Sequence, residues 1–202
     1  YSFVYAVEDT SGVCSNDQAT ITVELNEQGN AGNTTQIDVC ETDGSFDLYS
    51  ELNGFPDQGG YWEDLSTTQG FNIDEFDPSA GDGPGTYEFQ YTVEDSNCPS
   101  NSSILTVNSH HQPYAGQDGA TSICNSEDSL NLFLFIGGNA DAGGEWTNLI
   151  YQNSIDGNYW DSRGVPAGQY DFDYTVEDPS GACPSDESTV SVEVTEQGYA
   201  GE

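Results

Sequence analysis

Internal repetition constrains this chain more than any other feature of its sequence. The string Tyr-Ala-Val-Glu-Asp at 5–9 returns as Tyr-Thr-Val-Glu-Asp at 91–95 and again at 174–178, and a cysteine follows each copy. Cys40 and Cys124 keep nearly the same step, since they lie 84 residues apart (124 − 40). A period of this length is too long for a solenoid unit and suits a small independent domain.

The repeat divides the chain into two complete units and part of a third. Ala-Gly pairs recur at the same step, so we expect the last part of one repeat at 1–32 and complete repeats at 33–116 and 117–202. Tyr1 opens directly on an alternating pattern, which suggests a window cut from a longer array. The joining segments have only about six residues, and joints of that length allow bending with little free tumbling.

Apolar and polar residues alternate within each unit. In the segment 86–94 the apolar residues Tyr87, Phe89, Tyr91 and Val93 alternate with polar ones, which predicts a strand with one buried face. Pro and Gly separate such runs, and no stretch of helical length has a period of 3.6. About seven short strands per unit predict an all-β fold, with tandem immunoglobulin-like antiparallel β-sandwich domains in a linear array.

Several aromatic residues recur at fixed places in the repeat. Trp62 and Trp146 follow a repeated Gly-Gly pair, and we expect both in the core. Tyr87 and Tyr170 follow turns that contain Pro and Gly. That placement is typical of a tyrosine corner, in which the phenol folds back onto the turn. Simple core packing is the alternative for these tyrosines.

The cysteines follow the same repeat. Each complete unit holds two, which predicts the disulfides Cys40–Cys98 and Cys124–Cys183. Cys14 corresponds to the second cysteine of a unit, so its partner is expected outside this sequence. Such bonds indicate an oxidising, extracellular compartment. The alternatives are reduced cysteines in a cytosolic protein and a zinc site, although the chain has no Cys-x-x-Cys pair.

The charge of the chain excludes two classes of partner. The sequence has 36 acidic residues against one basic residue, Arg163, and its formal net charge is −35. Nucleic acid and anionic membrane surfaces are therefore excluded as partners, because both need clustered Lys or Arg. No apolar run approaches the roughly 18 residues that a membrane-spanning helix needs, so direct membrane insertion is not expected.

The same acidity raises the question of calcium, the one cofactor for which the sequence offers candidates. Carboxylates recur near the ends of strands, and the candidate ligands are Asp9, Asp43, Asp95 and Asp178. Calcium takes six to eight oxygen ligands, which such loops can supply. The alternative is an acidic solvated surface with a diffuse ion atmosphere, since no Asp-x-Asp-x-Asp-Gly loop occurs.

No catalytic residues are predicted. The sequence lacks the Gly-x-Ser-x-Gly, His-Glu-x-x-His and phosphate-binding glycine motifs. Near-identical units in series also favour reach and multiplicity over a single active site. The adjacent histidines His110 and His111 lie where one unit passes to the next, and we interpret them as exposed linker residues.

The order of the motifs resembles the Ig-like repeats of giant Bacteroidota surface proteins, the gliding-motility-associated, SprB-like adhesins that the type IX secretion system exports. The resemblance covers essentially the whole chain and is carried by the following residues of the middle unit: Cys40, Asp43, Gly44, Ser45, Leu48, Gly59, Gly60, Trp62, Pro84 to Tyr87, Phe89, Tyr91 to Val93, Asp95, Cys98 and Pro99. The last unit repeats most of them. It departs from the pattern where 153–156 and 159–160 replace the stretch seen at 76–78.

The resemblance implies a structural stalk segment of a long secreted adhesin or filament, attached to the outer membrane at the cell surface. The implied partners are neighbouring repeats of the same chain, together with surface glycans or other cells. Ser129, in the string Asp-Ser-Leu, matches a Bacteroidota O-glycosylation pattern. The alternative function is an array of carbohydrate-binding Ig-like modules, for which Tyr159 and Trp160 of the last unit offer an aromatic platform.

Overall fold

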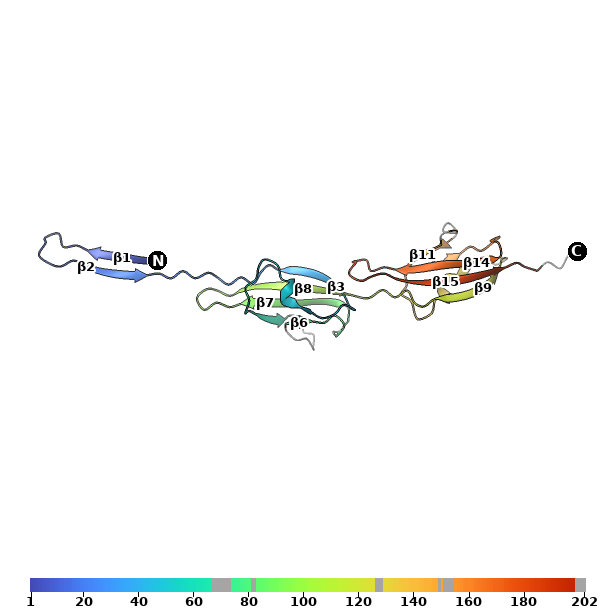
Figure 1. Ribbon diagram of the computed structural model, residues 1–202, viewed down its shortest axis with the longest axis horizontal. Coiled ribbons are helices and arrows are strands. Elements are labelled where there is room, and N and C mark those ends of the chain that lie inside the picture. Colours follow the sequence, from blue (N-terminus) through green and yellow to red (C-terminus); the bar gives the residue numbers. More distant parts are fainter. Residues whose placement is uncertain (67–73, 81–82, 126–128, 149, 151–154, 199–202) are drawn as a thin grey trace.

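The computed structural model describes residues 1–66, 74–80, 83–125, 129–148, 150 and 155–198. Strands dominate this part of the chain, and its helical segments are two short 3-10 turns. Figure 1 shows three groups of strands that follow one another in chain order along the long axis of the view. We call them the N-terminal hairpin, the second unit and the third unit.

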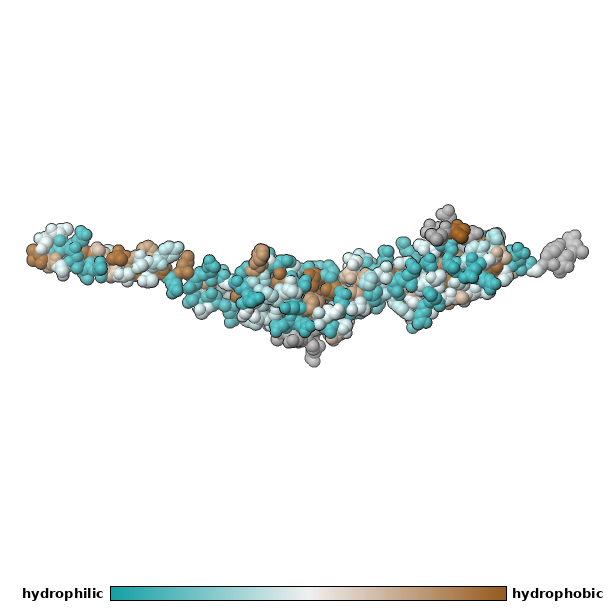
Figure 2. All heavy atoms as spheres, in the orientation of Figure 1, coloured by the Kyte–Doolittle hydropathy of each residue, from teal (hydrophilic) through white to brown (hydrophobic). Residues whose placement is uncertain are grey.

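The N-terminal hairpin is a two-stranded antiparallel sheet of β1 (Ser2–Val7) and β2 (Asp17–Thr22). It leaves many large apolar side chains exposed, namely Tyr1, Phe3, Val4, Tyr5, Val7, Val13, Ile21, Val23 and Leu25. Figure 2 shows several hydrophobic residues on the hairpin, at the left end of the view. By the repeat, β1 corresponds to the strand at Gly85–Val93, whose equivalent apolar residues are buried. The hairpin thus exposes a face that is covered in a complete unit.

The second unit consists of a large and a small sheet. The large sheet has the order β3-β8-β7-β5, and its strands are β3 (Thr35–Cys40), β5 (Tyr61–Asp64), β7 (Gly85–Val93) and β8 (Asn101–His110). The small sheet pairs β4 (Phe46–Asp47) with β6 (Glu75–Phe76), and the 3-10 turn η1 (Leu48–Glu51) follows β4 directly.

The third unit repeats this arrangement. Its large sheet has the order β11-β14-β15-β9, and its strands are β9 (Gly119–Cys124), β11 (Glu145–Thr147), β14 (Gly168–Val176) and β15 (Asp186–Thr195). Its small sheet has the order β10-β13-β12, built from β10 (Leu130–Asn131), β12 (Ile155–Asp156) and β13 (Tyr159–Trp160). The 3-10 turn η2 (Leu132–Phe135) follows β10, as η1 follows β4.

One strand pair in each large sheet is parallel, while the other pairs are antiparallel. β3 runs parallel to β8, with Cys40 opposite His110. β9 runs parallel to β15, with Cys124 opposite Thr195. The C-terminal ends of the first and last strands of a unit therefore lie side by side. The last strand leads from there out of the unit.

Alternating residues of the long strands build a separate core in each unit, which confirms the predicted period of two. In β7 the apolar residues Tyr87, Phe89, Tyr91 and Val93 are buried. The core of the second unit also contains Ala31, Leu48, Leu52, Trp62, Phe76, Leu105 and Val107, and that of the third unit contains Ala115, Leu132, Trp146, Trp160, Val165, Phe172, Tyr174, Val176, Val190, Val192 and Val194. Ala31 and Ala115 thus pack into the core that follows them in the chain.

Glycine is required for steric reasons at the second position of the repeated Gly-Gly pair. A Cβ on Gly60 would lie 2.5 Å from the carbonyl oxygen of Thr92, so only glycine allows this approach. The Gly60 amide donates to the Tyr91 hydroxyl at 2.9 Å, and that hydroxyl donates to the carbonyl oxygen of Asp57 at 2.8 Å. Gly144 and Tyr174 make the equivalent bond at 2.8 Å.

The tyrosine corners are present in both complete units. The Tyr87 hydroxyl donates to the carbonyl oxygen of Gly83, four residues earlier. The Tyr170 hydroxyl donates to that of Pro166 at 2.8 Å. Both tyrosines therefore fold back onto the turn that precedes their strand, as the sequence predicted. In the described part of the chain, no helix has the length and apolar character needed to cross a membrane.

Candidate functional site: the junction between units

The two cysteines of a unit lie at opposite ends of its large sheet. Cys40 ends β3 beside His110, the last residue of β8. Cys98 lies in the turn between β7 and β8, whose first paired residues are Val93 and Asn101. The nine residues of β7 span roughly 30 Å at about 3.3 Å per residue. A disulfide within one unit would have to cross this length, which exceeds the usual Cα separation several times over.

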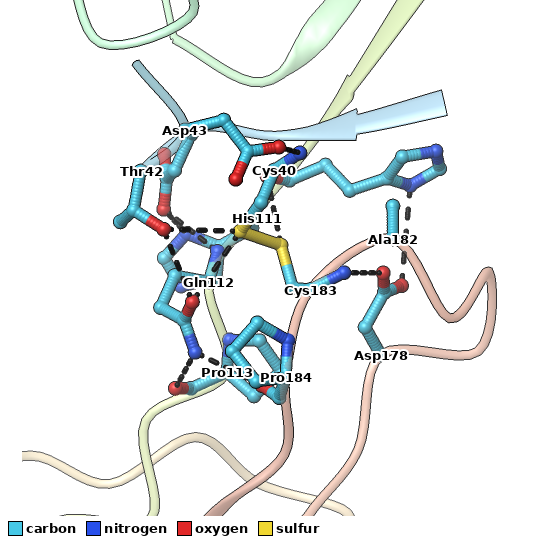
Figure 3. The surroundings of a disulfide bond; sticks show 12 residues. Cys40, Thr42, Asp43, His111, Gln112, Pro113, Asp178, Ala182, Cys183 and Pro184 are labelled. Carbon is cyan, nitrogen blue, oxygen red and sulfur yellow. Dashed lines mark hydrogen bonds and ion pairs between the residues drawn. A yellow bond between two sulfur atoms is a disulfide. The ribbon is translucent and has the colours of Figure 1, made fainter. Parts of the chain in front are cut away.

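The structure therefore corrects the predicted pairing. Cys40 bonds to Cys183, with 4.9 Å between the Cα atoms and a sequence separation of 143 residues. Cys98 and Cys124 are free, so the predicted bonds Cys40–Cys98 and Cys124–Cys183 are wrong. Cys14 is also free and exposed, and its pairing outside this sequence stays a prediction. The disulfide joins the end of β3 in the second unit to the β14–β15 turn of the third unit (Figure 3).

A buried carboxylate shapes the turn that presents Cys183. Asp178 accepts the backbone N–H groups of Ser180 at 3.0 Å and of Cys183 at 2.9 Å, and it also accepts the Ser180 hydroxyl. Its side chain is only 5% exposed. The bond from the Ser180 hydroxyl, followed by that from the Cys183 amide, lowers the pKa of Asp178 to about 2. The turn is thus held by an ionised side chain that points at the cysteine backbone.

The other calcium candidates have similar structural roles. Asp9 accepts the amides of Val13 and Cys14 at 2.8 and 2.6 Å. These and the Ser11 hydroxyl lower its pKa well below the usual range, the Cys14 bond contributing most. Asp95 accepts the Cys98 amide at 3.1 Å, and Asp43 accepts the Cys40 amide at 2.9 Å. Each predicted candidate therefore bonds to the backbone N–H of a cysteine.

These carboxylates do not converge on one point. Among the described residues, no group of three or more His, Cys, Asp or Glu side chains is arranged so that it could hold a metal ion. The structure thus places Asp43 and Asp178 on the two cysteines of one disulfide, whereas Asp9 and Asp95 bond to cysteines elsewhere in the chain. Calcium binding stays a prediction of the sequence.

Two histidines connect carboxylates of the second and third units. His110 Nε2 lies 2.9 Å from Asp38 Oδ1, and its Nδ1 lies 3.9 Å from Asp178 Oδ1. Hydrogen bonding to His110 is the main cause of the lowered pKa of Asp38. His111 lies 2.6 Å from Glu41 and 3.5 Å from Asp141. The sequence interpretation of these residues as plain linker missed these contacts, because their neighbours are distant in the sequence.

Gln112 is a second contact across the junction. Its side-chain amide donates to the carbonyl oxygen of Pro184 at 3.0 Å, in the segment just after the disulfide. Its amide oxygen accepts the Thr42 hydroxyl at 3.2 Å, and its backbone N–H donates to Glu41 Oε1 at 2.8 Å. Gln112 thus bonds at once to the end of the second unit and to the turn of the third (Figure 3).

The linker itself is fixed to the unit that follows it. The Tyr114 amide donates to Asp141 at 2.9 Å, and the Ala115 amide donates to Asp186 at 2.8 Å. The Ser188 hydroxyl donates to the carbonyl oxygen of Ala115 at 2.7 Å. With these bonds, little of the joining segment is free to swing.

The structure separates the two residues of the proposed sugar platform. Trp160 is fully buried, with its ring centroid 4.7 Å from that of Phe172. It pairs with Leu130 as Phe76 pairs with Phe46 in the second unit, so it is a core residue and cannot stack on a sugar. The offset of 84 residues between Phe76 and Trp160 could have shown this equivalence. Tyr159 is 53% exposed, and glycan binding there stays a prediction.

Ser129 is exposed immediately before β10. The preceding residue of its glycosylation pattern, Asp128, lies outside the described residues. Exposure is compatible with modification, which stays a prediction.

The chain is distantly similar to several solved structures. No family model matches the chain, and no curated protein matches it. Immunoglobulin domains 1–5 of Sidekick-1 are 13% identical with a TM-score of 0.46, over 82% of this chain and 38% of that one. Titin domains I67–I69, in an E-to-A mutated variant, are 10% identical with a TM-score of 0.40, over 96% and 74%. A Ca²⁺-stabilized adhesin of an Antarctic bacterium is 16% identical with a TM-score of 0.32, over 100% and 58%.

The chain thus spans less than two thirds of the Sidekick-1 and adhesin structures that it resembles. Similarities at this level do not assign a function. The all-β fold rests on the strands and sheets of the chain itself.

Proposed function

We propose that this chain is a structural stalk segment of a long secreted cell-surface adhesin or filament, and that it acts mechanically, without catalysis. The observation that carries the proposal is the disulfide between Cys40 and Cys183, which links two consecutive units. A bond within each unit would be enough to stabilise separate domains, whereas a bond between units also transmits tension from one unit to the next.

The position of the bond determines the covalent path that bears a load. Tension applied at the two ends of the chain passes along β3 to Cys40, crosses to Cys183 and leaves along β15. The 142 residues between the two cysteines (143 − 1) are outside this path. Fully extended, they would measure roughly 500 Å at about 3.5 Å per residue. The disulfide therefore prevents this length from being pulled out.

Other features suit an extracellular stalk. Structural disulfides persist in oxidising compartments. The net charge of −35 gives neighbouring fibres a mutual repulsion that opposes aggregation. Attachment to an outer membrane and participation in gliding motility belong to the proposal through the sequence resemblance alone.

Single-molecule stretching of the 202-residue chain tests the proposal. With handles at the termini, the oxidised protein should extend by roughly 500 Å less than the reduced protein, because the residues between Cys40 and Cys183 stay shielded. The Cys40→Ser variant should extend fully without reductant, and Cys98→Ser, which removes a free thiol, should behave as the parent. Equal extension of the oxidised and reduced parent would contradict the proposal.

A further inference from the structure

The free thiol of Cys98 occupies the same position as a bonded sulfur elsewhere in the chain. Cys98 Sγ lies 3.8 Å from the carbonyl oxygen of Asn26, at the end of the hairpin segment. Cys183 Sγ lies 3.5 Å from the carbonyl oxygen of His110, at the end of β8. Asn26 and His110 are 84 residues apart (110 − 26), which is the repeat step. Cys98 thus meets the preceding unit as Cys183 does.

The contact around Cys98 also repeats. The Gln28 side-chain amide donates to the carbonyl oxygen of Pro99 at 3.1 Å. The equivalent bond from Gln112 to Pro184 measures 3.0 Å. At each junction a glutamine therefore binds the proline that follows the cysteine. At the second junction this cysteine, Cys183, is also bonded to Cys40 of the preceding unit.

Cys124 reproduces the other half of the disulfide. It ends β9 opposite Thr195, as Cys40 ends β3 opposite His110. The residue after each cysteine donates its backbone N–H to the carbonyl oxygen of the residue opposite that cysteine. Asn125 donates to Thr195 at 3.0 Å, and Glu41 donates to His110 at 2.8 Å. Cys124 is therefore presented at the outgoing end of its unit in the pose of the bonded Cys40.

We propose that Cys98 and Cys124 are half-sites of further disulfides between repeats. Cys98 bonds to the first cysteine of a preceding repeat, and Cys124 bonds to the second cysteine of a following one. Each repeat is then linked covalently to both neighbours by bonds of the Cys40–Cys183 type. The inference rests on the proposed function only in that it places this chain among further repeats.

The chemistry of each bond is a two-electron oxidation. Two thiols lose two protons and two electrons, which pass to a disulfide oxidant such as oxidised glutathione, and that oxidant becomes two thiols. The new S–S bond then lies between adjacent repeats. In an array, the load crosses one such bond, follows the last strand of a unit into the first strand of the next, and crosses again.

An appended repeat tests Cys124. A copy of residues 117–201 is joined after Gly201 of the full chain, the protein is oxidised with glutathione, and disulfide-linked peptides are mapped by mass spectrometry. We expect Cys124 bonded to the appended copy of Cys183, with Cys40–Cys183 retained, and loss of maleimide labelling at Cys124. Replacing the appended copy of Cys183 by Ser should restore that labelling. A free Cys124 in the folded, extended protein would overturn the proposal.

A prepended segment tests Cys98 independently, should the first extended protein fail to fold. A copy of residues 33–86 placed before Tyr1 completes the hairpin into a unit and supplies a copy of Cys40. We expect that copy bonded to Cys98, and Cys98 to become unreactive. A bond from the copied cysteine to Cys14, within its own unit, would refute the inference.

These assays are separate from the stretching experiment. The proposed function fails if the Cys40–Cys183 bond shields no length. The present inference fails if the new cysteines stay free or pair within a unit, whatever the mechanics of the parent chain.

Discussion

The two junctions of the chain share a set of equivalent hydrogen bonds and differ in their covalent bond and in their histidine contacts. The first junction comprises residues 26–31 with the turn 95–101, and the second comprises residues 110–115 with the turn 178–186. In the first, the Asn30 amide donates to Asp57 at 2.8 Å; in the second, the Tyr114 amide donates to Asp141 at 2.9 Å. Only the second junction has a disulfide and the histidine–carboxylate pairs.

This difference shows that the docking geometry does not depend on the disulfide. Cys98 Sγ lies 3.8 Å from the preceding segment without a covalent bond, and the Gln28–Pro99 hydrogen bond that holds it there is equivalent to the Gln112–Pro184 bond beside Cys183. The noncovalent contacts place the cysteine, and oxidation then fixes what they have placed.

Of the changes at the two junctions, loss of the disulfide should lower the stability of the protein most. We expect Cys40→Ser to lower the free energy of unfolding by about 2–4 kcal/mol, because the bond closes a long loop and restricts the unfolded chain. Urea unfolding of the oxidised proteins measures this. Cys98→Ser is the matched control and should leave the unfolding midpoint unchanged. Equal midpoints for Cys40→Ser and the parent would show that the bond adds no stability.

Loss of a carboxylate that binds a linker should increase the mobility of the linker more at the first junction, which has no disulfide, than at the second. Asp57→Ala removes the acceptor of the Asn30 amide, and Asp141→Ala removes that of the Tyr114 amide. A hydrogen bond of this kind contributes about 1 kcal/mol. We expect Asp57→Ala to loosen the hairpin, whereas Asp141→Ala should leave the third unit tethered by its disulfide. Small-angle scattering or NMR relaxation measures the change in mobility, and an equal loosening at both junctions would contradict the expectation.

Much of the fold could be predicted from the sequence because its causes are local. A period of two identifies the buried face of β7, and Pro-Gly turns before Tyr87 and Tyr170 indicate the corners. The steric demand at Gly60 explains a motif that the repeat already revealed.

The disulfide could not be predicted in the same way, because it depends on strand direction. Spacing alone allows Cys40 to pair with Cys98 if the first strand ends near the end of β7. The parallel pairing of β3 with β8 places Cys40 at the other end of the sheet. The relative direction of two strands that are far apart in the sequence cannot be predicted from the local pattern of apolar and polar residues. The contact of His110 with Asp38 was missed for the same reason, since β3 and β8 are far apart in the sequence. The burial of Trp160 is different, because its offset of 84 residues from Phe76 already marks it as a core position.

Acid should weaken the second junction through Asp178. Its pKa is lowered to about 2, so its contribution to stability is complete above the ordinary aspartate range and is lost as the pH falls through about 2. We expect the unfolding midpoint of the parent to fall between about pH 4 and pH 2. Asp178→Asn should show a lower midpoint at neutral pH and a flatter dependence over this window. A variant that follows the parent curve would indicate that the carboxylate does not support the turn.

Removal of calcium should have the smallest effect. The predicted ligands Asp43, Asp95 and Asp178 each bond to the backbone N–H of a cysteine, and the described residues contain no group of three or more His, Cys, Asp or Glu side chains that could hold a metal ion. We therefore expect EDTA at fixed ionic strength to leave the melting midpoint of both units unchanged, while added salt of any kind raises it by screening the acidic surface. If EDTA instead lowers the midpoint and calcium but not sodium restores it, specific ions stabilise the junctions. Repeating the measurement on Cys40→Ser then locates them, because an ion at the second junction should matter more once the disulfide no longer holds the two units together.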